Sequence, residues 1–138
     1  MASDAKRPLE LAREVFAAYE GKNRRALENL VAGNFRFTSP YDDHIGRDEY
    51  FKRCWPNSER IREFRFIDAA ETDKGVFVLY LCTLVSGTAF RNCEHLVFKD
   101  GKLISVEVFF GDPPSGVAKS DYPRFVETAQ AAWRQARH

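Results

Sequence analysis

Two polar side chains, an amide and a carboxyl, lie near the middle of a strand-forming stretch in the second half of the chain. The segment 90–111, FRNCEHLVFKDGKLISVEVFFG, predicts two β-strands that fold back on each other at Lys99–Gly101. Asn92 and Glu94 lie in its first strand. A carboxyl group among Phe, Leu and Val loses hydration, which raises its pKa and disfavours the charged form. Such an acid can donate a hydrogen bond or a proton, so Glu94 is a candidate catalytic residue; a purely structural hydrogen bond or ion pair is the alternative.

The register of this hairpin decides which side chains share a face, because a shift of one residue reverses every side chain. A two-residue type I′ loop would place Glu94 opposite Glu107, and a three-residue loop would place it opposite Val106. The three-residue loop separates apolar from polar residues better and avoids two adjacent carboxylates, so we expect it. The two-residue loop would instead turn His95 into the cavity. The expected inner face carries Phe90, Asn92, Glu94, Leu96, Phe98, Ile104, Val106, Val108 and Phe110, and the outer face Arg91, Cys93, His95, Val97, Leu103, Ser105, Glu107 and Phe109.

A second group of chemically capable residues follows the first predicted strand. The sequence Tyr41-Asp42-Asp43-His44 comes directly after Pro40 and predicts a turn. A histidine beside carboxylates can titrate near neutral pH, and loops often carry functional residues. Asp42 and His44 are therefore candidate catalytic residues. An ordinary solvated turn is the alternative interpretation.

The three cysteines do not have the spacing of a zinc site or a disulfide framework. We expect Cys54, Cys82 and Cys93 to be buried free thiols, and we expect neither a metal nor an organic cofactor. Little supports a cysteine nucleophile, because the sequence fixes no histidine beside Cys54 or Cys93.

The predicted helices precede most of the predicted strands. Apolar residues recur at helical spacing from Pro8 to Gly21, and shorter helices are predicted at 23–33 and 47–55. Strands are predicted at 34–39, from Phe64 to the turn 73–75, at 76–82 and in the hairpin; the strand 76–82 is apolar on both faces, which predicts a sheet covered on both sides. This order predicts an α+β fold, a curved antiparallel sheet wrapped around N-terminal helices with an apolar interior. A last helix is predicted from Asp121.

The amino-acid composition argues against some classes of binding partner. The chain has 138 residues, 44% of them hydrophobic, which suits one packed domain. Lys plus Arg (21) nearly balance Asp plus Glu (20), so we expect no binding to nucleic acid or to a membrane surface. The first ten residues contain no apolar run of a secretory signal, and no segment reads as a membrane-spanning helix, which leads us to expect a cytoplasmic protein.

The stretches FTSPYDDHIGRDEYF and DGKLISVEVFFG, with the order of elements, resemble the SnoaL-like branch of the nuclear-transport-factor-2-like superfamily. The similarity covers about residues 9–111 of an expected single domain 1–138, and we predict a C-terminal helical extension at 121–137. It implies a cone-shaped, cystatin-like fold with an apolar cavity, and a homodimer packed through the sheet. The superfamily hosts isomerases, cyclases, dehydratases and non-catalytic binders, so the resemblance implies no single activity.

Ketosteroid isomerases, which belong to this superfamily, use a general-base Asp together with a Tyr and a protonated Asp. The resemblance places Glu94 at the protonated Asp, Ser39 at the base, and the Tyr at or near Glu14. Two of the three groups are changed, so we do not expect steroid isomerisation by that mechanism. SnoaL-like cyclases use Asp and His side chains in the same cavity, which supports Asp42 and His44 as candidates.

We therefore expect a pocket for a small hydrophobic ligand or substrate. One hypothesis is cofactor-free acid–base isomerisation, cyclisation or dehydration of a hydrophobic carbonyl compound. In that case Asn92 and Glu94 hold or protonate an oxygen, and the base comes from the turn 41–44 or from water. The alternative is a non-catalytic ligand-binding or dimerisation module. The residues expected to line the pocket are Phe16, Tyr19, Tyr41, Trp55, Asn92, Val106, Val108 and Phe110.

Overall fold

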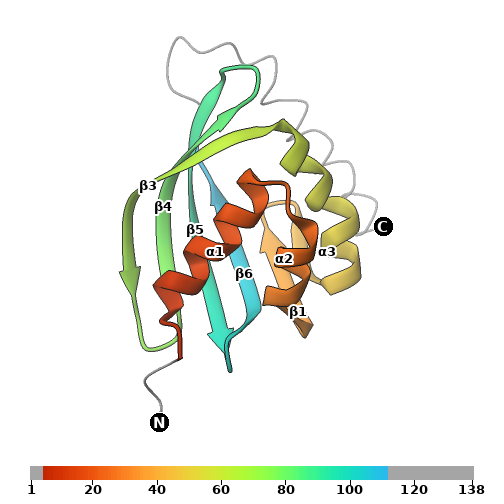
Figure 1. Ribbon diagram of the computed structural model, residues 1–138, viewed down its shortest axis with the longest axis vertical. Coiled ribbons are helices and arrows are strands. Elements are labelled where there is room, and N and C mark those ends of the chain that lie inside the picture. Colours follow the sequence, from red (N-terminus) through yellow and green to blue (C-terminus); the bar gives the residue numbers. More distant parts are fainter. Residues whose placement is uncertain (1–4, 112–138) are drawn as a thin grey trace.

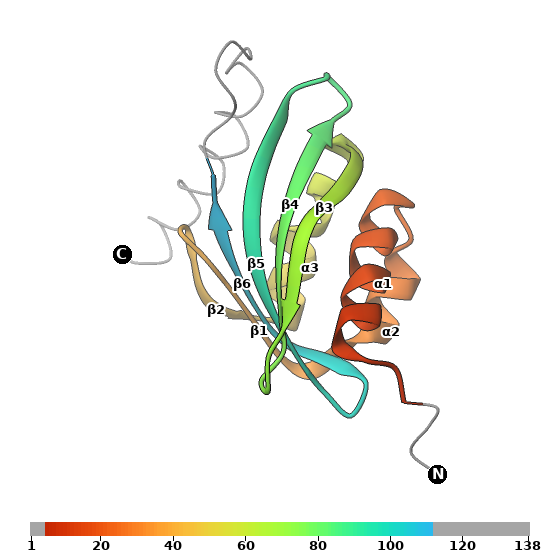
Figure 2. The same ribbon diagram turned by 90° about the vertical axis from the view of Figure 1, so that its left-hand side faces the viewer.

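A curved six-stranded sheet wraps around the helices (Figures 1 and 2). The computed structural model describes residues 5–111, so the helix predicted from Asp121 lies outside the described residues. The strands follow the order β2-β1-β6-β5-β4-β3, which confirms the predicted α+β cone. In chain order the elements are α1 (Pro8–Glu20), α2 (Arg24–Leu30), β1 (Val31–Ser39), β2 (Asp42–Gly46), α3 (Arg47–Arg53), the 3₁₀ helix η2 (Trp55–Arg60), β3 (Ile61–Glu71), β4 (Val76–Leu84), β5 (Ala89–Lys99) and β6 (Lys102–Phe110).

The helices begin and end where local chemistry requires. Pro8 occupies the first turn of α1, where its missing N–H costs no hydrogen bond. The Asn23 side chain caps α2 by accepting a hydrogen bond from the N–H of Ala26 at 3.1 Å. Two helices are shorter than predicted: α2 ends at Leu30 because Val31 already enters β1, and α3 gives way to η2 just before Pro56, which cannot continue an α-helix.

One strand pair differs from the predicted antiparallel sheet. β1 and β6 run parallel, with Phe37 beside Val106, whereas the other four pairs are antiparallel. Parallel neighbours need a long crossover connection. Here β2, α3, η2 and three further strands lie between β1 and β6 in the chain, which supplies that connection. The sheet is therefore mixed.

The turn of the β5–β6 hairpin is not the predicted one. Lys99 pairs with Lys102, and the two loop residues Asp100 and Gly101 have φ values of 53° and 76°. Positive φ at both positions defines a two-residue type I′ turn, so the predicted three-residue loop is wrong. A β-bulge follows at once: Phe98 pairs with Leu103 and Val97 with Ser105, which leaves Ile104 as the extra residue.

The bulge places the apolar residues of β6 on the face that carries Asn92 and Glu94. Glu94 lies opposite Val108, neither of the partners considered from the sequence, yet it still faces the inside of the cone. His95 faces outward, where its ring stacks on Phe77 with a centroid separation of 4.2 Å. Leu103 was predicted on the outer face and is fully buried, because the bulge lies between it and the rest of β6.

The outer face of the sheet is less covered than the sequence predicted. In the described part of the chain, Phe77, Leu79 and Phe109 are 41%, 38% and 51% exposed. Leu79, Cys93 and Phe109 form one cross-strand row, because Leu79 pairs with Cys93 and Cys93 with Phe109. The apolar outer positions of β4 therefore lie on an accessible surface.

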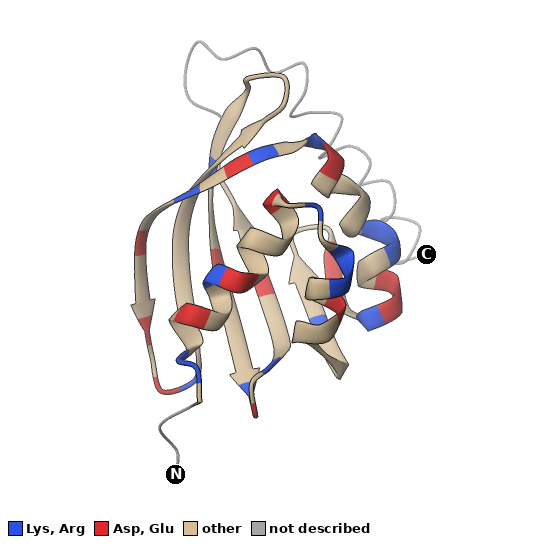
Figure 3. Ribbon diagram, viewed as in Figure 1, with Lys and Arg blue, Asp and Glu red and all other residues tan. Residues whose placement is uncertain are grey.

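Charged residues of both signs are distributed over the helices and strands (Figure 3). This agrees with the balanced composition, which offers no strong field of one sign. Among residues 5–111, no helix combines the length and the hydrophobicity needed to cross a membrane.

The bulge can be tested by paired substitutions in β6. Leu103→Ala should lower the free energy of unfolding by about 2–5 kcal/mol, because it leaves a cavity in the core. Ile104→Ala should cost distinctly less, since Ile104 is only half-buried. Urea denaturation of both variants measures the difference. A larger cost at Ile104 than at Leu103 would favour the three-residue loop instead.

Candidate functional site

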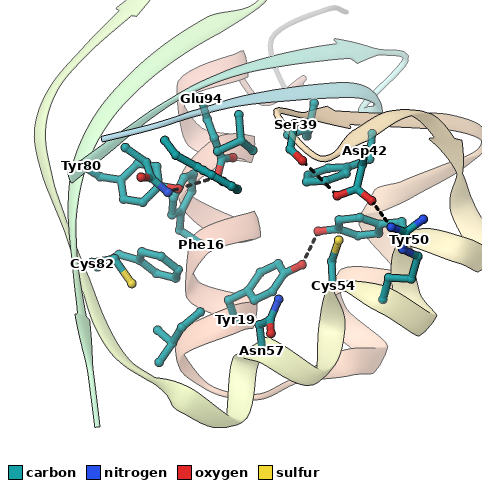
Figure 4. Close-up of a pocket in the computed structure, with 18 of the residues that line it drawn as sticks. Phe16, Tyr19, Ser39, Asp42, Tyr50, Cys54, Asn57, Tyr80, Cys82 and Glu94 are labelled. Atoms are coloured by element: carbon teal, nitrogen blue, oxygen red, sulfur yellow. Dashed lines mark hydrogen bonds and ion pairs between the residues drawn. The ribbon is translucent and has the colours of Figure 1, made fainter. Parts of the chain in front are cut away.

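The cone encloses a cavity of about 410 Å³, a size typical of small-molecule sites (Figure 4). Its wall is formed by α1, α3, η2, β2 and the inner face of the sheet. Aromatic side chains dominate the wall, among them Phe16, Phe37, Phe64 and Phe90. Lys52 and Pro56 line the cavity and are exposed, so it opens beside α3 and η2. An apolar wall of this kind favours an apolar ligand.

Glu94 is an acidic group within this apolar wall. Its Oε1 accepts a hydrogen bond of 2.8 Å from the Tyr80 hydroxyl. The Tyr80 oxygen accepts one of 3.2 Å from Asn92 Nδ2, and Asn92 Oδ1 accepts one of 3.1 Å from the N–H of Gly111. Burial raises the pKa of Glu94 to about 7, and the hydrogen bond from Tyr80 lowers it in part. Both the neutral and the ionised form are therefore available near neutral pH.

A pair of tyrosines forms a second polar group in the cavity. Tyr19 from α1 and Tyr50 from α3 are hydrogen-bonded to each other through their hydroxyls (Figure 4). Burial raises the pKa of each phenol well above its ordinary value, so both stay neutral at physiological pH. A neutral phenol can donate a hydrogen bond to an oxygen of a ligand.

Asp42 is the second carboxyl group in the wall, and its charge is balanced. Arg53 Nη2 lies 2.7 Å from Asp42 Oδ1, and Ser39 Oγ donates to Asp42 Oδ2 at 3.0 Å. Ser39 Oγ also accepts a hydrogen bond of 3.1 Å from the N–H of Tyr41. Asp42 is 6% exposed, and a buried charge of this kind requires its ion-pair partner. No group of three or more His, Cys, Asp or Glu side chains among residues 5–111 could hold a metal ion.

The cysteines are free thiols of low reactivity. Burial raises the pKa of Cys54 far above its ordinary value and that of Cys82 to about 12. Cys93, which the pairing places on the outer face, is half-buried, and its pKa is also raised, chiefly by desolvation. Since the thiolate is the nucleophilic form, none of the three is activated. Free thiols agree with the sequence prediction, although only Cys82 is fully buried.

The structure brings most of the sequence-predicted residues into one wall. Glu94, Asp42, Phe16, Tyr19, Asn92, Val106, Val108 and Phe110 all line the cavity. Three others do not. His44 lies on β2 with 73% of its side chain exposed and its Nδ1 2.6 Å from Asp43. Tyr41 packs against the ring of Phe110, and Trp55 packs against Tyr19, each outside the cavity lining.

Two of the polar residues escaped the sequence analysis, and one position was misplaced. Tyr80 was taken for part of an apolar strand, although a tyrosine at an inward position needs a hydrogen-bond partner. Arg53 is the last residue of α3, and nothing in the sequence indicated that its side chain would lie in the cavity wall. The resemblance placed the helical tyrosine at or near Glu14, but Glu14 forms an ion pair with Lys6 at 3.0 Å. Tyr19, further along α1, is the residue that faces the cavity.

The raised pKa of Glu94 predicts how stability depends on pH. Because the pKa rises from 4.5 to about 7 on folding, the folded protein binds more protons than the unfolded chain between these values. Stability is therefore lost as the pH rises through this window. Glu94→Gln should gain up to about 3 kcal/mol relative to wild type between about pH 4 and about pH 8, since each pH unit contributes about 1.4 kcal/mol.

Urea denaturation at several pH values measures this difference. Glu107→Gln on the outer face of β6 is the matched control. A stability difference between Glu94→Gln and wild type that stays constant with pH would contradict the prediction.

Comparisons with solved structures identify proteins that share this fold. No model of a protein family matches the sequence, and no curated protein matches it. A crystal structure of a protein from Kribbella flavida aligns with a TM-score of 0.70 and 19% identity, covering 92% of this chain and 96% of that one. A nuclear-transport-factor-2-like protein of unknown function from Cytophaga hutchinsonii aligns with a TM-score of 0.64 and 19% identity, over 80% and 94%.

A protein from Catenulispora acidiphila with a ketosteroid isomerase-like fold, solved with trimethylamine, aligns with a TM-score of 0.62 and 16% identity. This alignment covers 77% of the present chain and 88% of the other. At these identities the comparisons concern the fold and not the activity. The chain has the nuclear-transport-factor-2-like fold, which ketosteroid isomerases share.

Proposed function

We propose that the cavity binds a small, mainly apolar carbonyl compound and catalyses cofactor-free proton transfer beside the carbonyl group. Isomerisation, cyclisation and dehydration all begin with such a transfer. The observation that carries the proposal is the Glu94 carboxyl group, which lies in an apolar wall with a pKa of about 7. An acid whose pKa lies near the working pH is suited to general acid catalysis.

Three groups have different roles in the proposed reaction: a base, an acid and a hydrogen-bond donor. Asp42 takes a proton from the carbon next to the carbonyl, and the electron pair of that C–H bond forms the new C=C bond. The carbonyl oxygen gains the charge, which neutral Glu94 and a hydroxyl of the Tyr19–Tyr50 pair stabilise by donating hydrogen bonds. In a substrate with a C=C bond at the β,γ position, Asp42 then returns its proton to the γ carbon, the double bond moves into conjugation with the carbonyl, and the isomerisation is complete.

This assignment supplies each role that the sequence resemblance left open. Glu94 keeps the position of the protonated acid, and Tyr19 takes the place expected near Glu14. Asp42 lies three residues after Ser39, the expected base position, and is hydrogen-bonded to it. We extend the proposal to membership of the SnoaL-like branch, whose cyclases also use an Asp in this cavity.

Non-catalytic ligand binding is the second candidate. It is favoured by the state of Asp42, because Arg53 and Ser39 already occupy both carboxylate oxygens. A ligand carbonyl would bind neutral Glu94, and its affinity would fall above about pH 7. An amine, such as the trimethylamine found with the Catenulispora acidiphila protein, would bind ionised Glu94 and show the opposite dependence.

Hydrogen–deuterium exchange tests the proposed reaction without knowledge of the natural substrate. The protein is incubated in D₂O with a panel of hydrophobic cyclic and aryl ketones, and loss of the α-hydrogen signals is followed by NMR. The wild type should accelerate exchange of at least one ketone. Glu94→Gln and Asp42→Asn should each reduce that rate by about 10²–10⁴-fold, because general acid–base catalysis contributes this much.

Glu107→Gln is the control, since Glu107 lies on the outer face of β6 opposite His95. It should exchange deuterium at the wild-type rate. Binding of ketones with no accelerated exchange would support the non-catalytic candidate, and unchanged exchange in Glu94→Gln would refute the role of that acid.

We also propose that the outer face of the sheet joins two copies of the chain. The apolar row Leu79–Cys93–Phe109 lies on this face, with the stacked rings of Phe77 and His95 beside it. Exposed apolar patches of this kind mark interaction surfaces, and a two-fold axis lets one patch pair with itself. The homodimer implied by the family resemblance is packed through the same sheet.

A charge in this row should separate the two copies. Phe109→Glu should convert a dimer into a monomer at micromolar concentration, as measured by light scattering, because the charge would lose its hydration at the interface. Val85→Glu is the control, since Val85 is 61% exposed and lies beyond the end of β4. A monomeric wild type would exclude the dimer.

A further inference from the structure

We propose that Tyr80 and Asn92 are positioning residues for Glu94, and that the backbone N–H of Gly111 sets the direction of the hydrogen bonds between them. This hydrogen-bond chain has three links. The N–H of Gly111 donates to Asn92 Oδ1 (3.1 Å), Asn92 Nδ2 donates to the Tyr80 oxygen (3.2 Å), and the Tyr80 hydroxyl donates to Glu94 Oε1 (2.8 Å). The inference rests on the proposed function in one respect, namely that Glu94 is the reactive acid.

The direction of this chain follows from its first member. A backbone N–H can only donate, so the atom of Asn92 that faces Gly111 must be its carbonyl oxygen. The amide nitrogen of Asn92 is thereby turned towards Tyr80, to which it donates. The Tyr80 oxygen accepts that bond, and its own hydrogen is directed to Glu94 Oε1. Gly111 thus fixes the orientation of the Asn92 amide, and Glu94 Oε1 is the acceptor of the Tyr80 hydroxyl.

The proton of neutral Glu94 is therefore confined to one oxygen. Oε1 is already an acceptor, so the acidic hydrogen belongs on Oε2, which has no hydrogen-bond partner within residues 5–111. A ligand oxygen that binds Glu94 meets this donor in a single orientation. Without the chain, the hydrogen could lie on either oxygen, and part of the acid would be unproductive.

The strand pairing explains why the four residues meet. Tyr80 pairs with Asn92 across β4 and β5, and Asn92 pairs with Phe110 across β5 and β6, so Gly111 follows directly beside it. Glu94 is two residues from Asn92 and shares its face of the sheet. Gly111 approaches the neighbouring strand closely, because a Cβ at this position would lie 2.2 Å from the carbonyl oxygen of Arg91.

The same series of hydrogen bonds opposes the effect of burial on the pKa of Glu94. Burial raises its pKa, and donation from Tyr80 stabilises the carboxylate and lowers it. The other titratable groups in the wall of this cavity are neutral phenols and thiols, or are paired with an opposite charge. These groups are Tyr19, Tyr50, Cys54, Cys82 and the Asp42–Arg53 ion pair, with Lys52 at the opening. Tyr80 is the residue that donates a hydrogen bond to the carboxyl.

The test is a ¹³C NMR titration of the Glu94 carboxyl in the full chain without ligand, with the signal assigned by its loss in Glu94→Gln. Tyr80→Phe should raise the pKa of Glu94 by about one to two pH units, which is the effect of removing a hydrogen bond to a charged group. Asn92→Leu should raise it by less. In the Tyr80→Phe background, Asn92→Leu should have no further effect, because Asn92 acts only through Tyr80.

Additive shifts would overturn the proposal, since an independent contribution of Asn92 would then be present. An unchanged pKa in Tyr80→Phe would overturn it as well. Gly111→Ala is a second route to the same answer: its Cβ displaces the N–H from Asn92, so the pKa should rise. Tyr41→Phe removes a phenol that packs on Phe110 without a bond to Glu94, and it should leave the titration unchanged.

The outcome can be separated from that of the proposed reaction. If the expected pKa pattern is found but no ketone exchanges deuterium, the positioning chain stands and the reaction is wrong. If Glu94→Gln abolishes exchange but the pKa pattern is absent, the reaction stands and the chain is wrong. Where both hold, the pH profile of exchange in Tyr80→Phe should move upward by the shift seen in the titration.

Discussion

The chemistry of the cavity depends on the β-bulge at Ile104. The tight turn at Asp100 and Gly101 would by itself pair Glu94 with Glu107, and the two strands could then not both direct their apolar residues inward. One extra residue in β6 reverses this outcome. A two-residue turn gives the hairpin its favoured twist, and the bulge then returns the alternation to the register that buries the apolar side chains. The apolar surroundings of a single acid thus depend on a backbone irregularity some distance from it.

Once it faces inward, Glu94 is governed by two opposing effects. Loss of hydration favours its neutral form, and the Tyr80 hydroxyl favours its charged form; burial is the larger effect. Asp42 lies in the same cavity with a different environment, because Arg53 provides a full opposite charge at 2.7 Å. Two carboxyls whose surroundings differ in this way can take different parts in one reaction, one as acid and one as base.

The sequence was informative where the signal is local. Helical spacing, the alternation of the strands and the unusual polarity of Glu94 predicted the cone, its cavity and the inward face of that acid. The loop escaped prediction because an Asp-Gly turn fits two loop lengths, and the bulge has no sequence signature of its own. Tyr80 and Arg53 were missed because their partners lie on other strands, Glu94 on β5 and Asp42 on β2. His44 has suitable chemistry but lies on the exposed side of β2.

The polar residues of the cavity form two groups that are held by different contacts. Glu94 and its hydrogen-bond chain belong to β4, β5 and the end of β6, where cross-strand pairing fixes their positions. Tyr19, Tyr50 and Asp42 come from α1, α3 and β2, which are connected to each other by their own contacts. Because the two groups use separate hydrogen bonds and ion pairs, a polar residue of one group can change without removing a hydrogen-bond partner from the other. This separation gives a physical reason why one fold can retain an acid and replace its base.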